Sequence, residues 1–368
     1  MSYGLQVRNA SGVIQLDTTK QGFELVDAID INEGNTSGSR SYPNLSGATL
    51  KVYSTYNYYA EYPAGNDSDT NVTVAYTNGY PTVTWSTNGY WTFGDTMYIL
   101  IDTLPVNYFG FKCVNDAGTV LLTDTFSSYS LLESKISSAV NVMPATNSYA
   151  SFFFGPAEGD WAFQWHTHEA VFYNVPVGSN PIFLAEIPSY PNGVQIRNVV
   201  QSGTTCTVKC IGYGVAPKIF AFIKQTSIAS TSSSFGLRLR NASGQITTDT
   251  GNGIFCTTHS LSEISILVDI NSVGYVNQTG LPTNLISTAR SCRTLFEVRE
   301  PDPYAMFEPD YIRKVYQKVW SKSSATQLRC DSRLFWTTTV FRGSGDIGFS
   351  FTSDIRLPIL ITDENAYI

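Results

Sequence analysis

Apolar and polar residues alternate over the first stretch of the chain, which reads YGLQVRNASGVIQLDT from residue 3 to residue 18. Leu5 and Val7 alternate with polar neighbours, and a second apolar stretch follows after a four-residue break. This pattern predicts two short strands joined by a turn. The break begins with Asn9, whose side chain can accept hydrogen bonds from the following backbone, and ends with Gly12, which tolerates positive φ. We therefore expect a β-hairpin.

Near-copies of this hairpin begin at Tyr108 and Phe235. Each copy has a glycine before its first strand, an Asn-x-x-Gly turn, and an Asp-Thr pair after its second strand. The glycines are Gly4, Gly110 and Gly236, and the pairs are Asp17-Thr18, Asp124-Thr125 and Asp249-Thr250. Three such features in one order indicate internal duplication. We predict three domains, at residues 1–107, 108–233 and 234–368, each the size of a small β-domain.

Most of the remaining chain also reads as short strands rich in β-branched and aromatic residues. Examples are residues 82–85, 151–154, 161–165, 170–173, 205–210 and 334–341. The predicted fold class is therefore all-β, with three tandem β-sandwich domains. One stretch differs, because after Pro309 the apolar residues recur at a helical spacing. They are Tyr311, Ile312, Val315, Tyr316, Val319 and Trp320, and they predict a short helix near residues 310–321 in the last domain.

The composition indicates a weakly charged surface. Hydrophobic residues make up 42% of the chain and charged residues 14%, so we expect a surface rich in Ser, Thr, Asn, Gly and Tyr. The net charge is −7 and no basic run occurs, which argues against nucleic acid as a partner. No apolar stretch approaches the roughly 18 residues of a membrane helix, and no signal peptide precedes the first strand, so we expect no membrane insertion. The six cysteines are then expected to be reduced.

Two histidines are candidate metal ligands. His166 and His168 lie two residues apart on a predicted strand, so both imidazoles face one side. One chain supplies too few ligands for a tight site, so metal binding requires several copies to meet at this strand; otherwise the two are ordinary polar residues. Residues 67–71 resemble the start of a calcium loop, but Val72 stands where that loop requires glycine. We expect no cofactor.

No catalytic arrangement is evident in the sequence. The chain contains no G-x-S-x-G turn, and its three histidines are the only candidates for the base of a serine triad. The carboxylate pair of a glycosidase cannot be read from the sequence. We therefore expect a protein that is not an enzyme.

Tyrosines are abundant, and several occur next to turn sequences. The candidate contacts to a receptor or protein partner are Tyr58, Tyr59, Tyr62, Tyr80, Tyr90 and Trp91. An aromatic ring with a polar group offers a large contact area at small entropic cost, which suits binding to sugars or proteins. The alternative is that these side chains pack within the strands of the fold.

The opening MSYGLQV-x-N-x-S-G resembles the start of a group of tail proteins from long-tailed bacteriophages. The resemblance covers the first 20 or so residues and their repeats at Gly110 and Gly236. It implies a structural, tail-fibre or receptor-binding protein at the tail tip, assembled in the host cytoplasm and located in the virion tail. It carries no catalytic residues.

From these observations we expect a virion protein of the tail tip or tail fibre that contacts other phage tail proteins. We also expect a homo-oligomer, a trimer or another symmetric set of copies, because phage tips are built on symmetry axes. Contact with a host-surface glycan or protein receptor is part of this hypothesis. The alternatives are an array of carbohydrate-binding modules, which would require export, and a capsid decoration protein.

Overall fold

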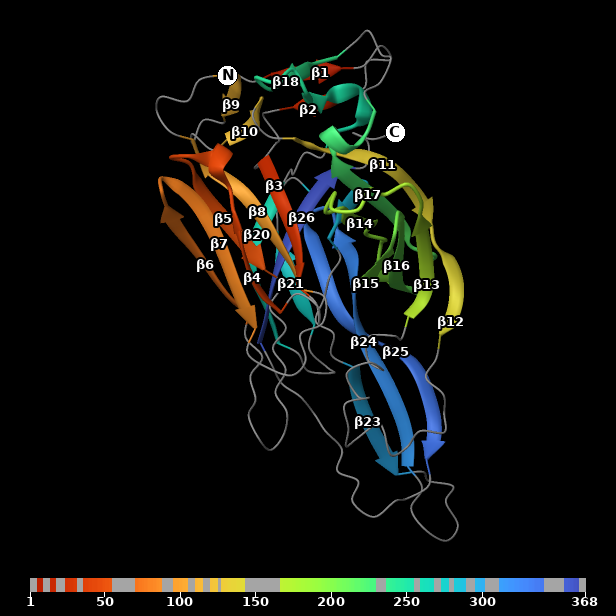
Figure 1. Ribbon diagram of the computed structural model, residues 1–368. Helices are drawn as coiled ribbons and strands as arrows, with labels where there is room; N and C mark the ends of the chain where they lie inside the picture. The colour runs from red at the N-terminus through yellow and green to blue at the C-terminus, as the bar shows by residue number, and fades with distance from the viewer. Residues whose placement is uncertain are drawn as a thin grey trace.

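The computed structural model describes residues 5–8, 14–17, 24–31, 36–54, 70–87, 95–104, 110–114, 120–124, 127–142, 166–229, 236–254, 259–267, 273–277, 281–288, 295–301, 311–340 and 354–363. Within these ranges the chain is built almost entirely from antiparallel β-strands, which confirms the predicted all-β fold class (Figure 1). The helices in these ranges are three single turns of 3-10 helix: η1 (Pro43–Leu45), η2 (Gln225–Ser227) and η3 (Thr250–Asn252).

Three of the sheets are two-stranded hairpins. They pair β1 (Gln6–Arg8) with β2 (Ile14–Asp17), β9 (Lys112–Val114) with β10 (Val120–Thr123), and β18 (Arg238–Arg240) with β19 (Ile246–Asp249). Their registers match position by position. Val7 lies opposite Leu16, Cys113 opposite Leu122, and Leu239 opposite Thr248, and the register shifts after each of these pairs. The three sequence copies therefore share one backbone geometry.

The strands after the first hairpin form two three-stranded sheets. One sheet has the order β3 (Glu24–Ile31), β8 (Asp95–Thr103), β5 (Thr49–Ser54), and the other has the order β4 (Ser37–Ser41), β7 (Tyr80–Thr87), β6 (Thr70–Thr77). A tight turn joins β6 to β7, where Asn78 and Gly79 have φ values of 56° and 83°. Positive φ at both central residues is the geometry of a type I′ hairpin turn, which explains the Asn-Gly sequence.

The rest of the chain forms a six-stranded and an eight-stranded sheet. The six-stranded sheet has the order β11 (Tyr129–Ile136), β17 (Lys218–Lys224), β14 (Ile182–Glu186), β22 (Leu285–Ser287), β26 (Asp354–Asp363), β20 (His259–Leu267). The eight-stranded sheet has the order β12 (Ser138–Val142), β13 (His166–Phe172), β16 (Thr205–Tyr213), β15 (Gly193–Ser202), β24 (Tyr311–Ser324), β25 (Gln327–Val340), β21 (Gly274–Asn277), and β23 (Leu295–Pro301) pairs with β24.

One strand order recurs after all three hairpins. The first strand after the hairpin pairs with the last strand of the segment, which pairs with a central strand: β3-β8-β5, β11-β17-β14 and β20-β26-β22. The opposite sheets also correspond, as β4-β7-β6, β13-β16-β15 and β21-β25-β24. This common order supports the hypothesis of duplication. The domain boundaries themselves stay a prediction, because residues 105–109 and 230–235 lie outside the described residues.

The second and third segments share continuous sheets. Ala185 of β14 pairs with Ser287 of β22, and Val194 of β15 pairs with Trp320 of β24. Each pairing joins strands of the two segments edge to edge, so these segments are not separate sandwiches linked in a row. Backbone pairing of this kind leaves little signal in the sequence, because any β-strand edge can supply the hydrogen bonds.

An apolar cluster unites all three segments. Its buried members are Leu25, Ala28, Tyr98 and Leu100 from the first segment, Tyr129, Ile182, Leu184, Phe220 and Phe222 from the second, and Ile286 from the third. Burial of each Leu, Ile or Phe side chain in the cluster contributes roughly 1.5–3 kcal/mol to folding. The cluster therefore fixes the segments against one another.

A buried carboxylate lies beside this cluster. Asp27 is 2% exposed, and the Arg40 guanidinium and the Tyr42 hydroxyl lie 2.7 Å and 3.0 Å from its Oδ2. From the second segment, the side-chain amide of Asn180 donates to Oδ1 at 3.0 Å and the Lys224 ammonium lies 3.2 Å from the same atom. Burial alone would raise the pKa of Asp27, but the two cations and these hydrogen bonds hold it below its ordinary value.

The predicted helix near residues 310–321 is wrong. Residues Tyr311–Ser324 form β24, which pairs along its length with β25 and also with β23. Val319, Trp320 and Ser321 are all buried, so both faces of this strand are covered at that end. The apolar spacing that suggested one helical face instead reflects a strand with neighbours on both sides, and its β-branched and aromatic residues suit that setting.

Candidate functional site: a cap of three hairpins

The three hairpins meet at one end of the molecule, at the top of Figure 1. We call this assembly the cap: strands β1, β2, β9, β10, β18 and β19. An apolar cluster joins them and includes Val7, Cys113 and Leu239, together with Leu122 and Leu237. Val7, Cys113 and Leu239 are the middle residues of β1, β9 and β18, at one shared position of the hairpin register. The three hairpins thus contribute the same register position to one small core.

The glycine that opens the second and third copies is required by the backbone. Gly110 and Gly236 have φ values of 136° and 125°, a region that L-residues with a side chain rarely adopt. At Gly110 an added Cβ would also lie 2.6 Å from a carboxylate oxygen of Asp124. Gly4 lies outside the described residues. In these two copies the opening glycine thus supplies the backbone conformation with which the hairpin starts.

The Asn-x-x-Gly turn of the third copy has the predicted geometry. The Asn241 side-chain oxygen accepts hydrogen bonds from the backbone N–H groups of Ser243 at 3.1 Å and Gln245 at 3.0 Å. The Gly244 N–H donates to the Asn241 carbonyl at 2.8 Å, and Gly244 has a φ of 78°. The equivalent turns of the first two copies lie outside the described residues.

The Asp-Thr pairs are not all equivalent. Arg238 pairs with Asp249 and Lys112 pairs with Thr123, so Thr123 and Asp124 occupy the positions of Asp249 and Thr250. The backbone agrees, since the Asp124 N–H donates to Phe111 at 3.2 Å as the Thr250 N–H donates to Leu237 at 3.0 Å. The second copy therefore carries these residues in reverse order, and the predicted Asp124-Thr125 match is displaced by one residue.

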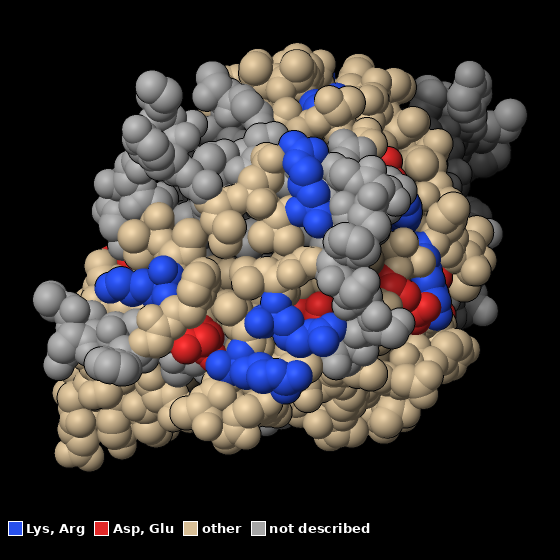
Figure 2. Space-filling model, turned by 90° about the horizontal axis from the view of Figure 1, so that it is seen from above, with Lys and Arg blue, Asp and Glu red and all other residues tan. Residues whose placement is uncertain are grey.

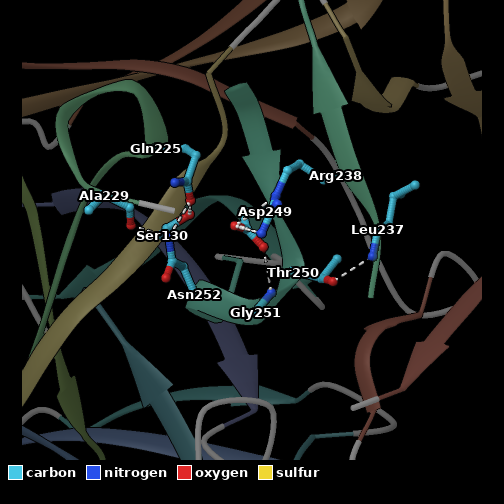
Figure 3. A network of polar contacts seen from close by, with 9 residues as sticks. All are labelled: Ser130, Gln225, Ala229, Leu237, Arg238, Asp249, Thr250, Gly251 and Asn252. Atoms are coloured by element: carbon cyan, nitrogen blue, oxygen red, sulfur yellow. Dashed lines mark hydrogen bonds and ion pairs between the residues drawn. The ribbon is translucent and has the colours of Figure 1, made fainter. Parts of the chain in front are cut away.

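A polar network attaches the third hairpin to the second segment (Figure 3). The Ser130 hydroxyl of β11 donates to the Gln225 side-chain oxygen at 2.8 Å, and the Asn252 amide donates to the same oxygen at 3.0 Å. On the hairpin side, Asp249 accepts from the Gly251 N–H at 3.1 Å and forms an ion pair with Arg238 at 2.9 Å. Ser130, Gln225 and Asp249 are buried, so these contacts fix the hairpin on the sheet beneath it.

The second hairpin lies on the first segment in the corresponding way, with β10 against β3 and β8. Here Glu24 occupies the register position that Ser130 holds in the second segment. Glu24 is 3% exposed, and neither carboxylate oxygen has a well-formed hydrogen bond to a described residue. Burial raises the pKa of Glu24 to about 8; the Asp124 charge adds to the rise, and the polar groups of Thr123 offset only part of it.

The outer face of the cap combines cations and apolar side chains. Arg8, Lys112, Arg238 and Arg240 are exposed and flank the inward-facing middle residues of their strands. Figure 2 looks down on this end and shows several Lys and Arg side chains on its described part, with Asp and Glu side chains beside some of them. Leu5, Phe111 and Val114 are 36–42% exposed on the same hairpins. This mixture is typical of protein–protein contact surfaces, in which arginine and aromatic residues are enriched.

Little in the sequence indicates this group of cations. Its cations come from three positions far apart in the chain, and no run of basic residues joins them. The signal that was available is the hairpin repeat: once the three copies are aligned, Arg8 aligns with Arg240, and Lys112 aligns with Arg238.

Most of the predicted aromatic contacts lie outside the described residues, namely Tyr58, Tyr59, Tyr62, Tyr90 and Trp91. Tyr80 begins β7, directly after the Asn78-Gly79 turn, and is half-buried. The structure therefore brings none of the described candidate tyrosines into the cap, and the role of the predicted group stays a prediction.

The two candidate metal ligands lie on β13 in different surroundings. His166 is 1% exposed, and its Nε2 lies 2.6 Å from a carboxylate oxygen of Glu169. His168 is half-buried, with its Nδ1 2.8 Å from the Thr167 hydroxyl, and burial lowers its pKa. Among the described residues no group of three His, Cys, Asp or Glu side chains is placed to hold a metal. A shared site between copies would require His166 to leave its buried pairing with Glu169.

The cysteines in the described part of the chain are thiols rather than disulfides: Cys113, Cys206, Cys210 and Cys330. Burial raises the pKa of Cys210 to about 12, so it is an unreactive core residue. Cys256 and Cys292 lie outside the described residues. Across the ranges that the structure describes, no helix is long and apolar enough to cross a membrane.

Comparison of the chain with protein-family models, curated proteins and solved structures finds no match.

Proposed function

We propose that this protein is a structural component of a phage virion, in the tail tip or tail fibre, and that the cap attaches it to another tail protein. One observation carries the proposal. The stretch that resembles phage tail proteins, together with its two repeats, is the stretch that forms the cap.

The physical character of the cap supports an assembly role. Exposed Arg8, Lys112 and Arg240 give it positive charge, although the whole chain carries a net charge of −7. Phe111 and Val114 add apolar area that gains from being covered. The matching partner is an acidic surface with an apolar centre on a neighbouring tail protein. We expect several symmetric copies, a trimer being the simplest arrangement.

Host contact is the second part of the proposal, and an array of carbohydrate-binding modules is its rival. Two half-exposed tyrosines outside the cap, Tyr190 and Tyr275, fit either of these functions. The two functions differ in where the protein is found: a virion component is present in purified particles, whereas a free lectin is not.

The test is protein mass spectrometry of purified virions after separation of heads from tails. We expect the chain in the tail fraction at a fixed copy number. Its presence only in the head fraction would instead indicate a capsid decoration protein. Its absence from both fractions, together with a monodisperse monomer by light scattering, would contradict the proposal.

A further inference from the structure

A second surface lies well below the cap, on the paired strands β21 and β25 (Figure 1). Tyr275 lies opposite Arg329, and Asn277 lies opposite Gln327. Leu328 and Cys330, which alternate with Arg329 on β25, are buried. Because neighbouring residues on a strand face opposite sides, these two cross-strand pairs share the outward face.

A second aromatic ring approaches the same face from another part of the chain. Tyr190 precedes β15, and the Arg329 guanidinium lies 4.3 Å from the centre of its ring and 5.8 Å from the ring centre of Tyr275. Cation–π attraction of this kind holds aromatic rings in a defined orientation. Tyr190 and Tyr275 are nonetheless 45% and 49% exposed. Arg329 thus joins two aromatic rings that remain open to solvent.

The surrounding polar contacts fix this arrangement. Asp331 is buried and forms an ion pair with Arg329 at 2.8 Å. The Tyr190 N–H donates to the Lys322 carbonyl at 3.0 Å, which holds the backbone at the ring. Little conformational entropy remains to be lost on binding, so the surface is preorganised for a ligand.

The chemistry of the surface indicates the class of ligand. The charges of Arg329 and Asp331 compensate each other, so the surface does not favour a strongly anionic or cationic ligand. The Gln327 amide donates to the Asn277 side-chain oxygen at 2.8 Å, which places a pair of oriented amides beside the rings. A sugar ring presents apolar C–H faces to aromatic rings and hydroxyl groups to amides. Cross-strand pairs two residues apart are separated by roughly 7 Å along the strand, which is on the scale of one sugar unit.

We propose that Tyr190, Tyr275, Asn277, Gln327 and Arg329 form a binding site for a neutral polysaccharide. The inference deepens the host-contact part of the proposed function and rests on it for its biological setting. Binding itself can be measured on the isolated protein. These tyrosines differ from the ones predicted from the sequence, because their proximity depends on the β21–β25 pairing and on a distant loop.

The experiment titrates the full chain with linear oligosaccharides of glucose, mannose, galactose and N-acetylglucosamine. Calorimetry and ligand-observed NMR give the affinities. We expect at least one of these oligosaccharides to bind at millimolar affinity or tighter. Tyr190→Ala and Tyr275→Ala should each weaken it by about tenfold, the effect of losing one stacking contact of about 1.4 kcal/mol. Tyr275→Phe, which keeps the ring, should weaken it by less than about threefold.

Tyr76→Ala is the matched control, because Tyr76 is 52% exposed on β6 and lies outside this surface. It should leave the affinity unchanged. Absence of binding by every oligosaccharide, or an unchanged affinity in both tyrosine variants, would overturn the inference. Salt-sensitive binding of dextran sulfate in place of the neutral sugars would also overturn it. If the protein is present in tails but binds no sugar, only this inference is contradicted. If it binds sugar but is absent from virions, the virion proposal is contradicted.

Discussion

Asn180 donates its side-chain amide to the Asp27 carboxylate at 3.0 Å, joining residues 153 positions apart in the chain. The same Asn180 accepts a hydrogen bond from the Tyr129 hydroxyl at its backbone carbonyl, at 3.1 Å. Asp27 belongs to the first segment, and Asn180 and Tyr129 belong to the second. The contact therefore connects two segments through a buried charge, which needs accurate positioning of every partner.

Replacing Asp27 should weaken the contact between the first and second segments. Asp27→Asn leaves Arg40 and Lys224 beside a neutral group, and we expect a loss of about 3 kcal/mol in the free energy of unfolding. This is the lower end of the usual range for a buried pair, because Arg40 and Lys224 keep part of their side chains in water. Urea unfolding measures the change. The control Asp102→Asn removes an exposed pair with Lys51 and should cost less than about 1 kcal/mol; equal losses would contradict this role of Asp27.

Glu24 should give the protein a stability that depends on pH. Its folded pKa of about 8 exceeds the unfolded value of 4.5, so the folded state holds the proton more tightly. The favourable contribution is then complete below pH 4.5 and is lost as the pH rises toward 8, by on the order of 4 kcal/mol. Glu24→Gln should abolish this loss.

Unfolding of the wild type and of Glu24→Gln can be compared at pH 4.5, 6.5 and 8.5, which span the unfolded and folded pKa values of Glu24. The difference between the two proteins should grow with pH and favour the variant. A difference that stays constant over the series would show that Glu24 is charged at neutral pH in the folded state.

The opening glycine of the second hairpin should not tolerate a side chain. Gly110→Ala combines a φ of 136° with a contact of 2.6 Å to Asp124, and we expect a loss of about 3 kcal/mol. Gly178→Ala is the matched control, because Gly178 also has positive φ, at 79°, but nothing lies within 4 Å of the added Cβ. It should lose only about 1 kcal/mol. Thermal unfolding measures the loss of stability in both variants. Similar losses would show that the contact with Asp124 is relieved at little cost.

The sequence was informative where structure depends on local chemistry. The hairpins, the Asn241 turn and the glycine at Gly236 follow from residues that are neighbours in the chain. The helix prediction failed because residues 311–324 pair with two strands, β23 and β25, and a local apolar spacing does not reveal such pairing. The Asp27 contacts and the Tyr190–Tyr275 surface were missed for the same reason: each requires segments whose proximity is set by the tertiary fold.

The cap should open as one unit. Leu239 is 9% exposed within the cluster that joins the three hairpins, and Leu239→Ala should cost about 2 kcal/mol locally. Hydrogen exchange by mass spectrometry should then become faster in peptides covering residues 5–17, 110–124 and 236–250 together. Peptides covering β14 serve as the internal reference and should not change. Faster exchange in the third hairpin alone would mean that the hairpins are energetically independent.

The most direct test of the proposed function asks whether the cap is the surface that joins the protein to the tail. Lys112→Glu/Arg240→Glu reverses two exposed cap charges, and Lys51→Glu/Lys209→Glu changes the net charge equally on β5 and β16. Each variant is supplied during tail assembly in place of the wild type, and its copy number in purified tails is measured. We predict that the cap variant folds but is missing from tails, while the control variant is incorporated at the wild-type level. Equal incorporation of both variants would contradict the proposal that the cap attaches the protein to the tail.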